Sequence, residues 1–228
     1  MKIRVAQRNT PLWSGAGRLA RQIYSRAYGA EINPDPDSFI VGHHEQWSAD
    51  GTGISACVGI TRAGERPFFS ERYLEDPIET VIGKQFGDSV ERSRIVEVGA
   101  LAGRERGAGQ EMVKITPVIS WYMGMEYILC TTTVALRRVL ERAEIGFVPV
   151  DDADPVVLGP EERRAWGTYY DQEPQVGVIS LRNVSGLFAE MTGRYSFIEP
   201  DPLGEPGSPT GPGSGPHTYE EVLSGAGS

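Results

Sequence analysis

Residues 94–110, "RIVEVGALAGRERGAGQ", combine residue types that can do chemistry together. An apolar run that contains Glu97 is followed by a loop of glycines and arginines. After the loop, Met112, Val113 and Ile115 have the spacing of buried residues in a helix. Backbone N–H groups converge where a glycine-rich turn meets a helix N-terminus, and the helix macrodipole adds partial positive charge there. This stretch therefore predicts an anion site, with phosphate as the expected ligand.

Three phosphate-loop patterns can be compared with this stretch. The mononucleotide loop needs Lys followed by Ser or Thr after its last glycine, whereas Gln110 and Glu111 stand there. The dinucleotide fingerprint needs a third glycine where Met112 stands, so it fits poorly. The third pattern is Arg or Gln, two residues, Gly, one residue, then Gly or Ala, and residues 104–109, "RERGAG", match it at every fixed position.

This hexapeptide resembles the pyrophosphate loop of the GNAT superfamily of acyl-CoA-dependent N-acyltransferases. Downstream, "TTTVALRRVLERAEIGF" at 131–147 resembles the fifth strand, the fourth helix and the terminal Gly-Phe pair of that superfamily. The resemblance implies an α/β fold, in which helices flank a mixed central sheet. Two central strands would splay apart and form a cleft for the pantetheine arm of the donor.

Five further blocks resemble the thermostable hemolysin family, which lies within this superfamily. They are "FFSERYLEDPIE", "RIVEVGALA", "TTTVALRRVL", "DADP" and "WGTYYDQEP", and the similarity spans roughly residues 14–182. The family name suggests membrane lysis, which would need an exported chain with an extended amphipathic or spanning segment. The sequence has neither, so we take the transferase-like core as the guide to function and expect no membrane insertion.

The resemblance implies a donor site on the glycine loop and the strand before it. The donor would be acyl-CoA, or an acyl group on the phosphopantetheine of a carrier protein, and no metal is expected. The pantetheine arm would bond the backbone of Val98, Gly99, Ala100 and Leu101, and the pyrophosphate would lie on Arg104, Arg106, Gly107, Ala108 and Gly109.

Glu97 is the candidate general base for attack of an amine on the thioester, because a carboxylate on this strand is a common base in the superfamily. Burial in an apolar strand would raise its pKa, which suits a base. The alternative is a structural glutamate paired with Arg92 or Arg94, and both interpretations stay open at this point.

The general acid is unassigned, because Arg142 stands where many superfamily members have a tyrosine that protonates the leaving thiolate. Tyr169 and Tyr170 are candidates by residue type, although aromatic residues beside Trp166 also suit packing.

Two function classes follow. The leading one is an N-acyltransferase that acylates an amine of a small molecule, in specialised-metabolite biosynthesis, and the other is a binding module that kept the fold without the chemistry. An acyl-homoserine-lactone synthase is a further enzyme alternative, but its Glu-x-x-Arg arrangement is absent because Ala100 follows Glu97 at that spacing. A carrier protein as donor would need a basic surface, and we expect one around the loop, formed by Arg92, Arg94, Arg104, Arg106, Lys114, Arg137, Arg138 and Arg142.

Composition narrows the field further. The chain has 228 residues, a net charge of −9 and a pI near 4.9, which argues against nucleic-acid binding. Cys57 and Cys130 lie in apolar stretches and are expected in the core, so we expect a reducing, cytoplasmic location. His43 and His44 alternate along a strand, and residues 151–154 lack calcium-loop spacing, so neither predicts a metal site.

The elements that must position these residues can be predicted from periodicity. Strands are expected at 2–7, 37–47, 53–63, 94–102, 126–133, 147–150 and 174–181, with a further strand at 67–74. Helices are expected at 14–29 with Ser14 as its N-cap, at 76–87 with Asp76 as its N-cap, and at 109–124 and 134–146. Residues 1–198 would form one GNAT-like domain, followed by a Pro/Gly/Ser-rich disordered tail at 199–228.

Overall fold

The computed structural model describes residues 1–43, 53–87, 89–105, 107–182 and 196–197. Its helices are α1 (Pro11–Tyr28), α2 (Ile78–Phe86), α3 (Ala108–Tyr122), α4 (Val134–Arg142) and α5 (Pro160–Ala165), with 3₁₀ turns η1 (Phe69–Tyr73), η2 (Arg92–Arg94), η3 (Pro155–Val157) and η4 (Tyr169–Gln172). Its strands are β1 (Lys2–Gln7), β2 (Ser38–His43), β3 (Ile54–Arg62), β4 (Ile95–Gly103), β5 (Tyr127–Thr132), β6 (Phe147–Asp152), β7 (Gln175–Ser180) and β8 (Ser196–Phe197).

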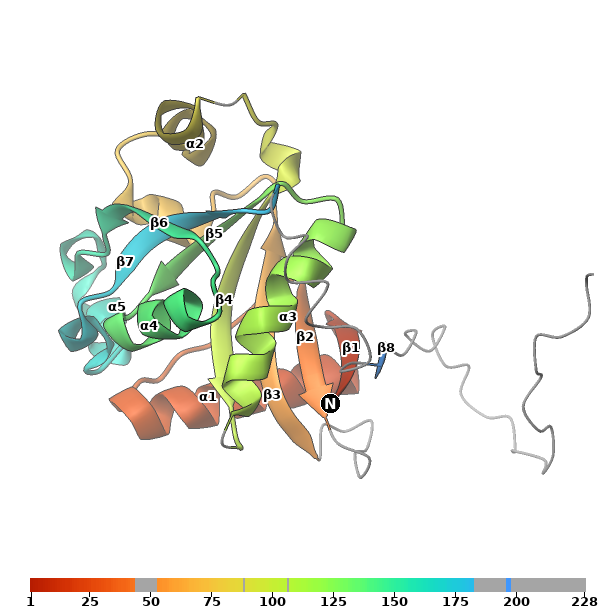
Figure 1. Ribbon diagram of the computed structural model, residues 1–228. Coiled ribbons are helices and arrows are strands. Elements are labelled where there is room, and N and C mark those ends of the chain that lie inside the picture. Colours follow the sequence, from red (N-terminus) through yellow and green to blue (C-terminus); the bar gives the residue numbers. More distant parts are fainter. Residues whose placement is uncertain (44–52, 88, 106, 183–195, 198–228) are drawn as a thin grey trace, which may run out of the picture.

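The strands in the described residues form one mixed sheet in the order β6-β7-β5-β4-β3-β2-β1-β8 (Figure 1). The pairs from β1 to β4 are antiparallel, β4 and β5 are parallel, and β7 pairs antiparallel with β5 and β6. The expected mixed α/β sheet is confirmed.

Helices cover both faces of the sheet. On one face, α3 and α4 pack on a core that includes Val96 and Ile128. On the other face, α1 packs on Cys57 and Ala102, while α2 and η1 pack on Ile95, Tyr127 and Leu129. Because successive residues of a strand point to opposite faces, Glu97 lies on the face of Ile95, toward η1 and α2.

The two central strands separate halfway along their length. Pairing of β4 with β5 runs from Ile95 and Tyr127 to Val98 and Cys130 and then stops. At the same point β4 bulges, since Ala100 and Leu101 together lie opposite the single residue Val58 of β3. Ala100 has a φ of 49°, a left-handed conformation that costs a non-glycine residue about 1–3 kcal/mol. The predicted splay of the central strands is therefore present, and the bulge lies at its start.

Most predicted elements are confirmed, with three local corrections. The N-cap of helix α1 is Thr10, four residues before the predicted cap Ser14, and its side chain accepts a hydrogen bond from Trp13 N at 3.2 Å. Residues 69–73 form a 3₁₀ turn and not a strand, because Glu71 accepts a bond from Phe68 N and closes the turn locally. Helix α2 has Pro77 and not Asp76 at its N-cap. The predicted disordered tail lies outside the described residues.

The C-terminal end of α1 is fixed to the segment after α5. Glu31 N donates to Ala165 O at 2.6 Å, and Thr168 N donates to Tyr28 O at 2.9 Å. Gly167 lies between these two bonds with a φ of 54°, and a Cβ on it would come within 2.1 Å of Tyr28 O. This position therefore requires glycine for both its conformation and its close contact with backbone.

We expect Gly167→Ala to destabilise the protein by at least about 2 kcal/mol, because it adds a left-handed alanine and a clash with backbone. Thermal or urea unfolding would measure the change. Gly159→Ala is the matched control, since a Cβ there has no neighbour within 4 Å and its φ is −61°. Equal stability of the two variants would contradict this role of Gly167.

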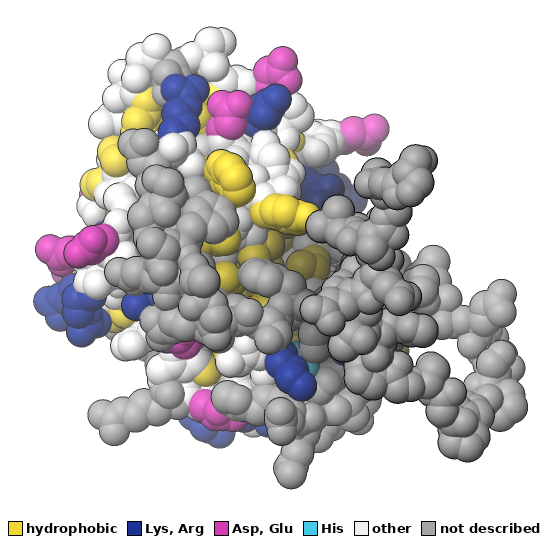
Figure 2. Space-filling view, turned by 45° about the vertical axis from the view of Figure 1, so that its right-hand side comes forward, with side chains coloured by type: hydrophobic (Ala, Val, Ile, Leu, Met, Phe, Trp, Pro, Cys, Tyr) yellow, Lys and Arg dark blue, Asp and Glu magenta, His cyan; other side chains and the backbone are white. Residues whose placement is uncertain are grey.

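The described helices include none with the length and apolar composition of a membrane span. Figure 2 shows hydrophobic side chains on the surface interspersed with acidic and basic ones. Trp121 and Tyr122, at the end of α3, are among the exposed large hydrophobic residues. They do not extend into an apolar helix face, since most of α3 is buried in the core.

Candidate active site

Glu97 is buried on β4, where β4 and β5 begin to separate. Its carboxylate accepts two backbone hydrogen bonds from η1, from Phe69 N at 2.9 Å and from Ser70 N at 2.7 Å. Burial raises the pKa of Glu97, and these hydrogen bonds oppose the rise. The arginines of the structural alternative are engaged elsewhere, because Arg92 pairs with Glu71 and Glu79, and Arg94 with Glu126.

The turn η1 connects several parts of the site. Ser70 is buried, and its hydroxyl lies 2.9 Å from the hydroxyl of Thr131 on β5. Ser70 therefore contacts both separated strands, through Glu97 on β4 and Thr131 on β5. Glu71 anchors the turn from its other side, accepting bonds from Arg92 and from Ile78 N.

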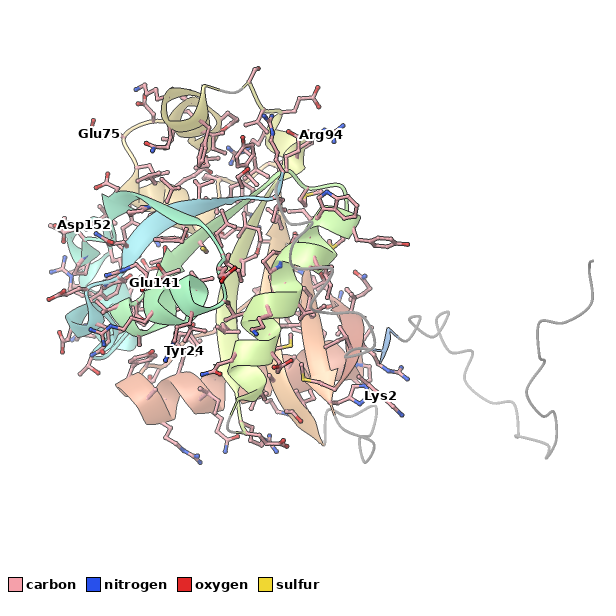
Figure 3. The ribbon with its side chains drawn as sticks, viewed as in Figure 1. Lys2, Tyr24, Glu75, Arg94, Glu141 and Asp152 are labelled. Carbon is pink, nitrogen blue, oxygen red and sulfur yellow. The ribbon has the colours of Figure 1, made fainter. Side chains whose placement is uncertain are left out.

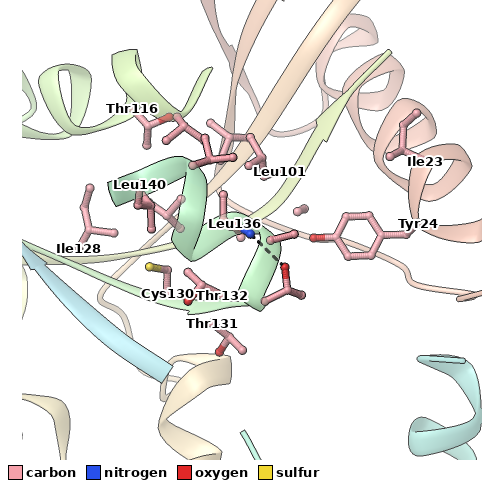
Figure 4. A pocket seen from close by; sticks show the side chains of 18 of the residues that line it. Ile23, Tyr24, Leu101, Thr116, Ile128, Cys130, Thr131, Thr132, Leu136 and Leu140 are labelled. Atoms are coloured by element: carbon pink, nitrogen blue, oxygen red, sulfur yellow. Dashed lines mark hydrogen bonds between the residues drawn. The ribbon is translucent and has the colours of Figure 1, made fainter. Parts of the chain in front are cut away.

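A mostly apolar cavity of about 290 Å³ lies where the strands diverge, between α3 and α4 on one face of the sheet and α1 on the other (Figure 4). Val98, Gly99, Ala100 and Leu101 of β4 line it, as do residues from α1, α3, β5 and α4. Beyond Val98, the edge of β4 that faces β5 has no strand partner in the described sheet, so its backbone groups can bond a ligand. All four residues predicted to hold the pantetheine arm thus lie along this cavity.

A second cavity of about 1070 Å³ lies on the α1 face of the sheet, against η1 and α5. Its lining mixes aromatic residues with charged ones, and it includes Glu97. The two cavities share Tyr24, Val98, Gly99, Ala100, Thr131 and Tyr169. They therefore meet at the opening between β4 and β5, beside Glu97.

The glycine loop joins β4 to the start of α3. Gly103 and Gly109 approach so closely that a Cβ on Gly103 would lie 2.8 Å from Gly109 N. Gly107 caps the helix with a φ of 86°, and Arg104 is exposed beside it. The first amides of a helix have no partner within it, so the amides around Gly109 suit an anion. Arg106 lies outside the described residues.

Tyr169 and Tyr170 belong to an aromatic cluster at the junction of the two cavities. Tyr169 is buried and stacks with Tyr24, and it packs edge-on against Tyr28. Burial raises the pKa of Tyr169 well above its usual value. Tyr170 lies at the second cavity, and its hydroxyl is 2.5 Å from that of Tyr73. Packing accounts for Tyr169, whereas Tyr73 and Tyr170 line the second cavity together with Glu97.

Two residues of the first cavity, Tyr24 and Cys130, were not predicted to belong to the site, although Cys130 was expected in the core. The hydroxyl of Tyr24 points from α1 into this cavity (Figure 4). Cys130 lines it from β5, and burial raises the pKa of its thiol to about 12. A thiol with this pKa is protonated at neutral pH and is a poor nucleophile.

The arginines expected to form one basic surface are divided between the two ends of the sheet. Arg92 and Arg94 precede β4, whereas Arg104 follows it, and Figure 3 shows Arg94 at the end of the molecule away from the start of α3. Arg137 is half-buried and donates to the carbonyls of Thr132 and Glu173. The expectation of one basic surface is therefore wrong for Arg92, Arg94 and Arg137, since the strand length separates the first two from the loop.

Several site residues had no local sequence signal, above all Ser70, Thr131 and Tyr73. Each lies far along the chain from its partner, so spacing could not reveal the contact. The acidic run at 151–154 is structural in part, because Asp154 accepts a bond from Val156 N and caps η3. Within the described part of the chain, no group of three potential metal ligands comes together.

Comparison with known proteins gives one family and a set of similar folds. The family described as thermostable hemolysin matches residues 6–185. The acyl-homoserine lactone synthase LasI is similar with a TM-score of 0.52 at 13% identity, covering 82% of this chain and 94% of that chain. No curated protein gives a significant match.

Two further solved structures have the same fold. The CoA-dependent acyl-homoserine lactone synthase BjaI has a TM-score of 0.53 at 11% identity, covering 87% of this chain and 93% of that chain. The N-acyl amino acid synthase FeeM, from uncultured soil microbes, has a TM-score of 0.51 at 10% identity, covering 81% of this chain and 98% of that chain. All three are acyltransferases, and the chain has their fold.

Proposed function

The chain belongs to the thermostable hemolysin family, and we propose that it is an N-acyltransferase of GNAT fold. In this proposal it moves an acyl group from a phosphopantetheine thioester to an amine of a small molecule. The similar folds are those of enzymes that perform acyl transfer, which supports the reaction class.

One observation carries the proposal. Two cavities, one that extends to α3 and α4 and one against η1 and α5, meet at the opening between β4 and β5, and Glu97 lies beside that opening. A thioester in the first cavity and an amine in the second would meet next to a buried carboxylate. Direct transfer needs this arrangement, because two reactants must be held together at one base.

The donor is either acyl-CoA or an acyl carrier protein. The glycine loop and Arg104 support a pyrophosphate-bearing donor, and the similar synthase BjaI is CoA-dependent. A carrier protein is acidic, so it would need local basic residues on this acidic chain. Arg104 on the loop and Arg138 on α4 are exposed. The sequence places Arg106 in the same loop as Arg104. We propose a role in specialised-metabolite biosynthesis, where both donors occur.

The chemistry proposed for the site is attack of the neutral amine on the thioester carbonyl. Glu97 accepts the amine proton as the new C–N bond forms, and the thiolate leaves when the C–S bond breaks. The backbone N–H bonds from η1 hold the carboxylate in one orientation, which lowers the cost of aligning it.

A transfer screen tests this function. Purified protein is incubated with acyl-CoA and with acyl-pantetheinyl carrier protein, each against a panel of amines, and products are identified by mass spectrometry. We expect an amide product from at least one pair. Donor binding without any product would favour a binding module that kept only the fold.

An acyl-homoserine-lactone-synthase-like activity is the second candidate, favoured by the similarity to LasI and BjaI. BjaI was solved with SAM and isopentyl-CoA, so the same screen includes SAM as acceptor. A lactone product would support this candidate. The sequence argues against it, because Ala100 stands where Glu-x-x-Arg requires arginine.

The rate of transfer should depend on pH through Glu97. The proposed base must be deprotonated, and burial raises its pKa above the usual 4.5. We therefore expect kcat/KM to increase with pH through a midpoint above 4.5, and to fall as Glu97 is protonated below it. A pH profile of kcat/KM measures this, and loss of the same acid limb in Glu97→Gln would assign it.

A further inference from the structure

The leaving thiolate must receive a proton, and the described site has no tyrosine on α4 to supply it, since Arg142 is exposed and bonds Arg138 O. Glu97 gains a proton from the amine in the same reaction. A path from Glu97 to the sulfur would therefore balance the reaction without any other acid.

The contacts of η1 offer such a path. Ser70 N donates to Glu97 Oε1 at 2.7 Å, so the Ser70 side chain and its hydroxyl lie beside this carboxylate. On its other side, the same hydroxyl lies 2.9 Å from Thr131 Oγ1, and either oxygen can be the donor. Both hydroxyls can donate and accept at once, which proton transfer along a chain requires.

Thr131 lies where the final proton transfer, to the sulfur of the leaving group, would take place. It lines both cavities, at the opening where the thioester and the amine would meet. In Figure 4 it lies next to Cys130 and Thr132 on the β5 side of the first cavity. Ser70 is buried and lines the second cavity but not the first, so its hydroxyl reaches the first cavity through Thr131.

We propose that Ser70 and Thr131 form a hydroxyl relay that carries the proton from Glu97 to the leaving thiolate, an inference that rests on the proposed acyl transfer. As the C–N bond forms, the amine proton passes to Glu97. The Glu97 carboxyl donates to Ser70 Oγ, Ser70 donates to Thr131 Oγ1, and Thr131 donates to sulfur as the C–S bond breaks. The products are an amide and a thiol, and both hydroxyls return to their starting state.

The relay predicts that the need for Thr131 depends on the leaving group. An alkyl thiolate needs a proton, whereas 4-nitrothiophenolate leaves as a stable anion. We therefore compare hexanoyl-CoA with 4-nitrothiophenyl hexanoate, using the best amine from the transfer screen. Thr131→Val should lower kcat about 10²-fold with hexanoyl-CoA, the scale of lost acid catalysis, and by less than about 3-fold with the aryl thioester.

Further variants separate chemistry from structure. Thr131→Ser keeps the hydroxyl and should restore most of the rate, while Ser70→Ala should match Thr131→Val, since its backbone N–H still holds Glu97. The double variant should be no slower than either single variant, because both substitutions interrupt the same proton path. Ser120→Ala is the control, a buried hydroxyl on α3 that should leave both rates unchanged.

The outcomes are distinct. Equal losses with both thioesters, or no loss with hexanoyl-CoA, would overturn the relay while leaving acyl transfer intact. Absence of any transfer by the wild-type chain would overturn the proposed function, and the relay with it. Melting temperatures and calorimetric CoA affinities of every variant show whether the fold and the donor site are preserved.

Discussion

Glu97→Gln should lower turnover by about 10²- to 10⁴-fold while donor affinity stays within about 2-fold, the range expected for loss of a general base. The base acts on the amine in the transition state, whereas the donor is held along β4 and the glycine loop, so the two effects separate. Steady-state kinetics gives turnover, and calorimetry with CoA gives donor affinity.

The variant needs a stability control, because a glutamine side chain would offer one acceptor oxygen to two backbone donors. Phe69 N and Ser70 N each bond one carboxylate oxygen of Glu97, so the amide NH₂ of glutamine would face one of these N–H groups. Glu97→Asp keeps the charge with a shorter side chain and should retain more activity than Glu97→Gln. Full turnover of a folded Glu97→Gln protein would show that Glu97 has a purely structural role.

Arg104→Ala combined with Arg106→Ala should weaken CoA binding by about 10²- to 10⁴-fold. Each charge-assisted bond to phosphate contributes about 1.5–3 kcal/mol, and a tenfold change in affinity corresponds to about 1.4 kcal/mol. Calorimetry with CoA and with a pantetheinylated carrier protein measures both donors. The helix amides remain in this variant, so residual anion binding is expected.

Arg94→Ala is the matched control for charge, because Arg94 lies at the opposite end of β4 and pairs with Glu126. It should leave both donor affinities unchanged. If the Arg104→Ala, Arg106→Ala variant bound both donors with unchanged affinity, the assignment of the pyrophosphate loop would be contradicted. A loss for the carrier alone, increasing at low salt, would identify the arginines as a docking surface for an acidic partner.

The sequence predicted most of the sheet because its strands are short apolar runs bounded by glycine, proline or polar residues. Residues 2–7 and 95–103 show this, and the glycine loop that follows could be placed from its own motif. The helix boundary at Thr10 was missed because Ser14 also suits a cap, although Pro11 at the first helical position favours Thr10. Local signals therefore specify the elements better than their ends.

The surroundings of Glu97 could not be predicted, since they depend on contacts between distant residues. Glu97 is 28 residues from Phe69, and Ser70 is 61 residues from Thr131. The aromatic run at 67–74 suggested a strand, but Glu71 closes a turn there and directs two backbone N–H groups at Glu97. Partner choice of this kind is set by the packed tertiary structure and not by spacing.

The meeting of two cavities at the opening between β4 and β5 has a consequence for the kinetic scheme. If each substrate reaches the opening from its own side, neither blocks the approach of the other, and binding can occur in random order. Both must be present before chemistry starts if the amine attacks the thioester directly. Burial raises the pKa of the Cys130 thiol, which disfavours an acyl-enzyme at this residue. Double-reciprocal plots at several fixed amine concentrations should accordingly intersect, and parallel lines would indicate an acylated enzyme instead.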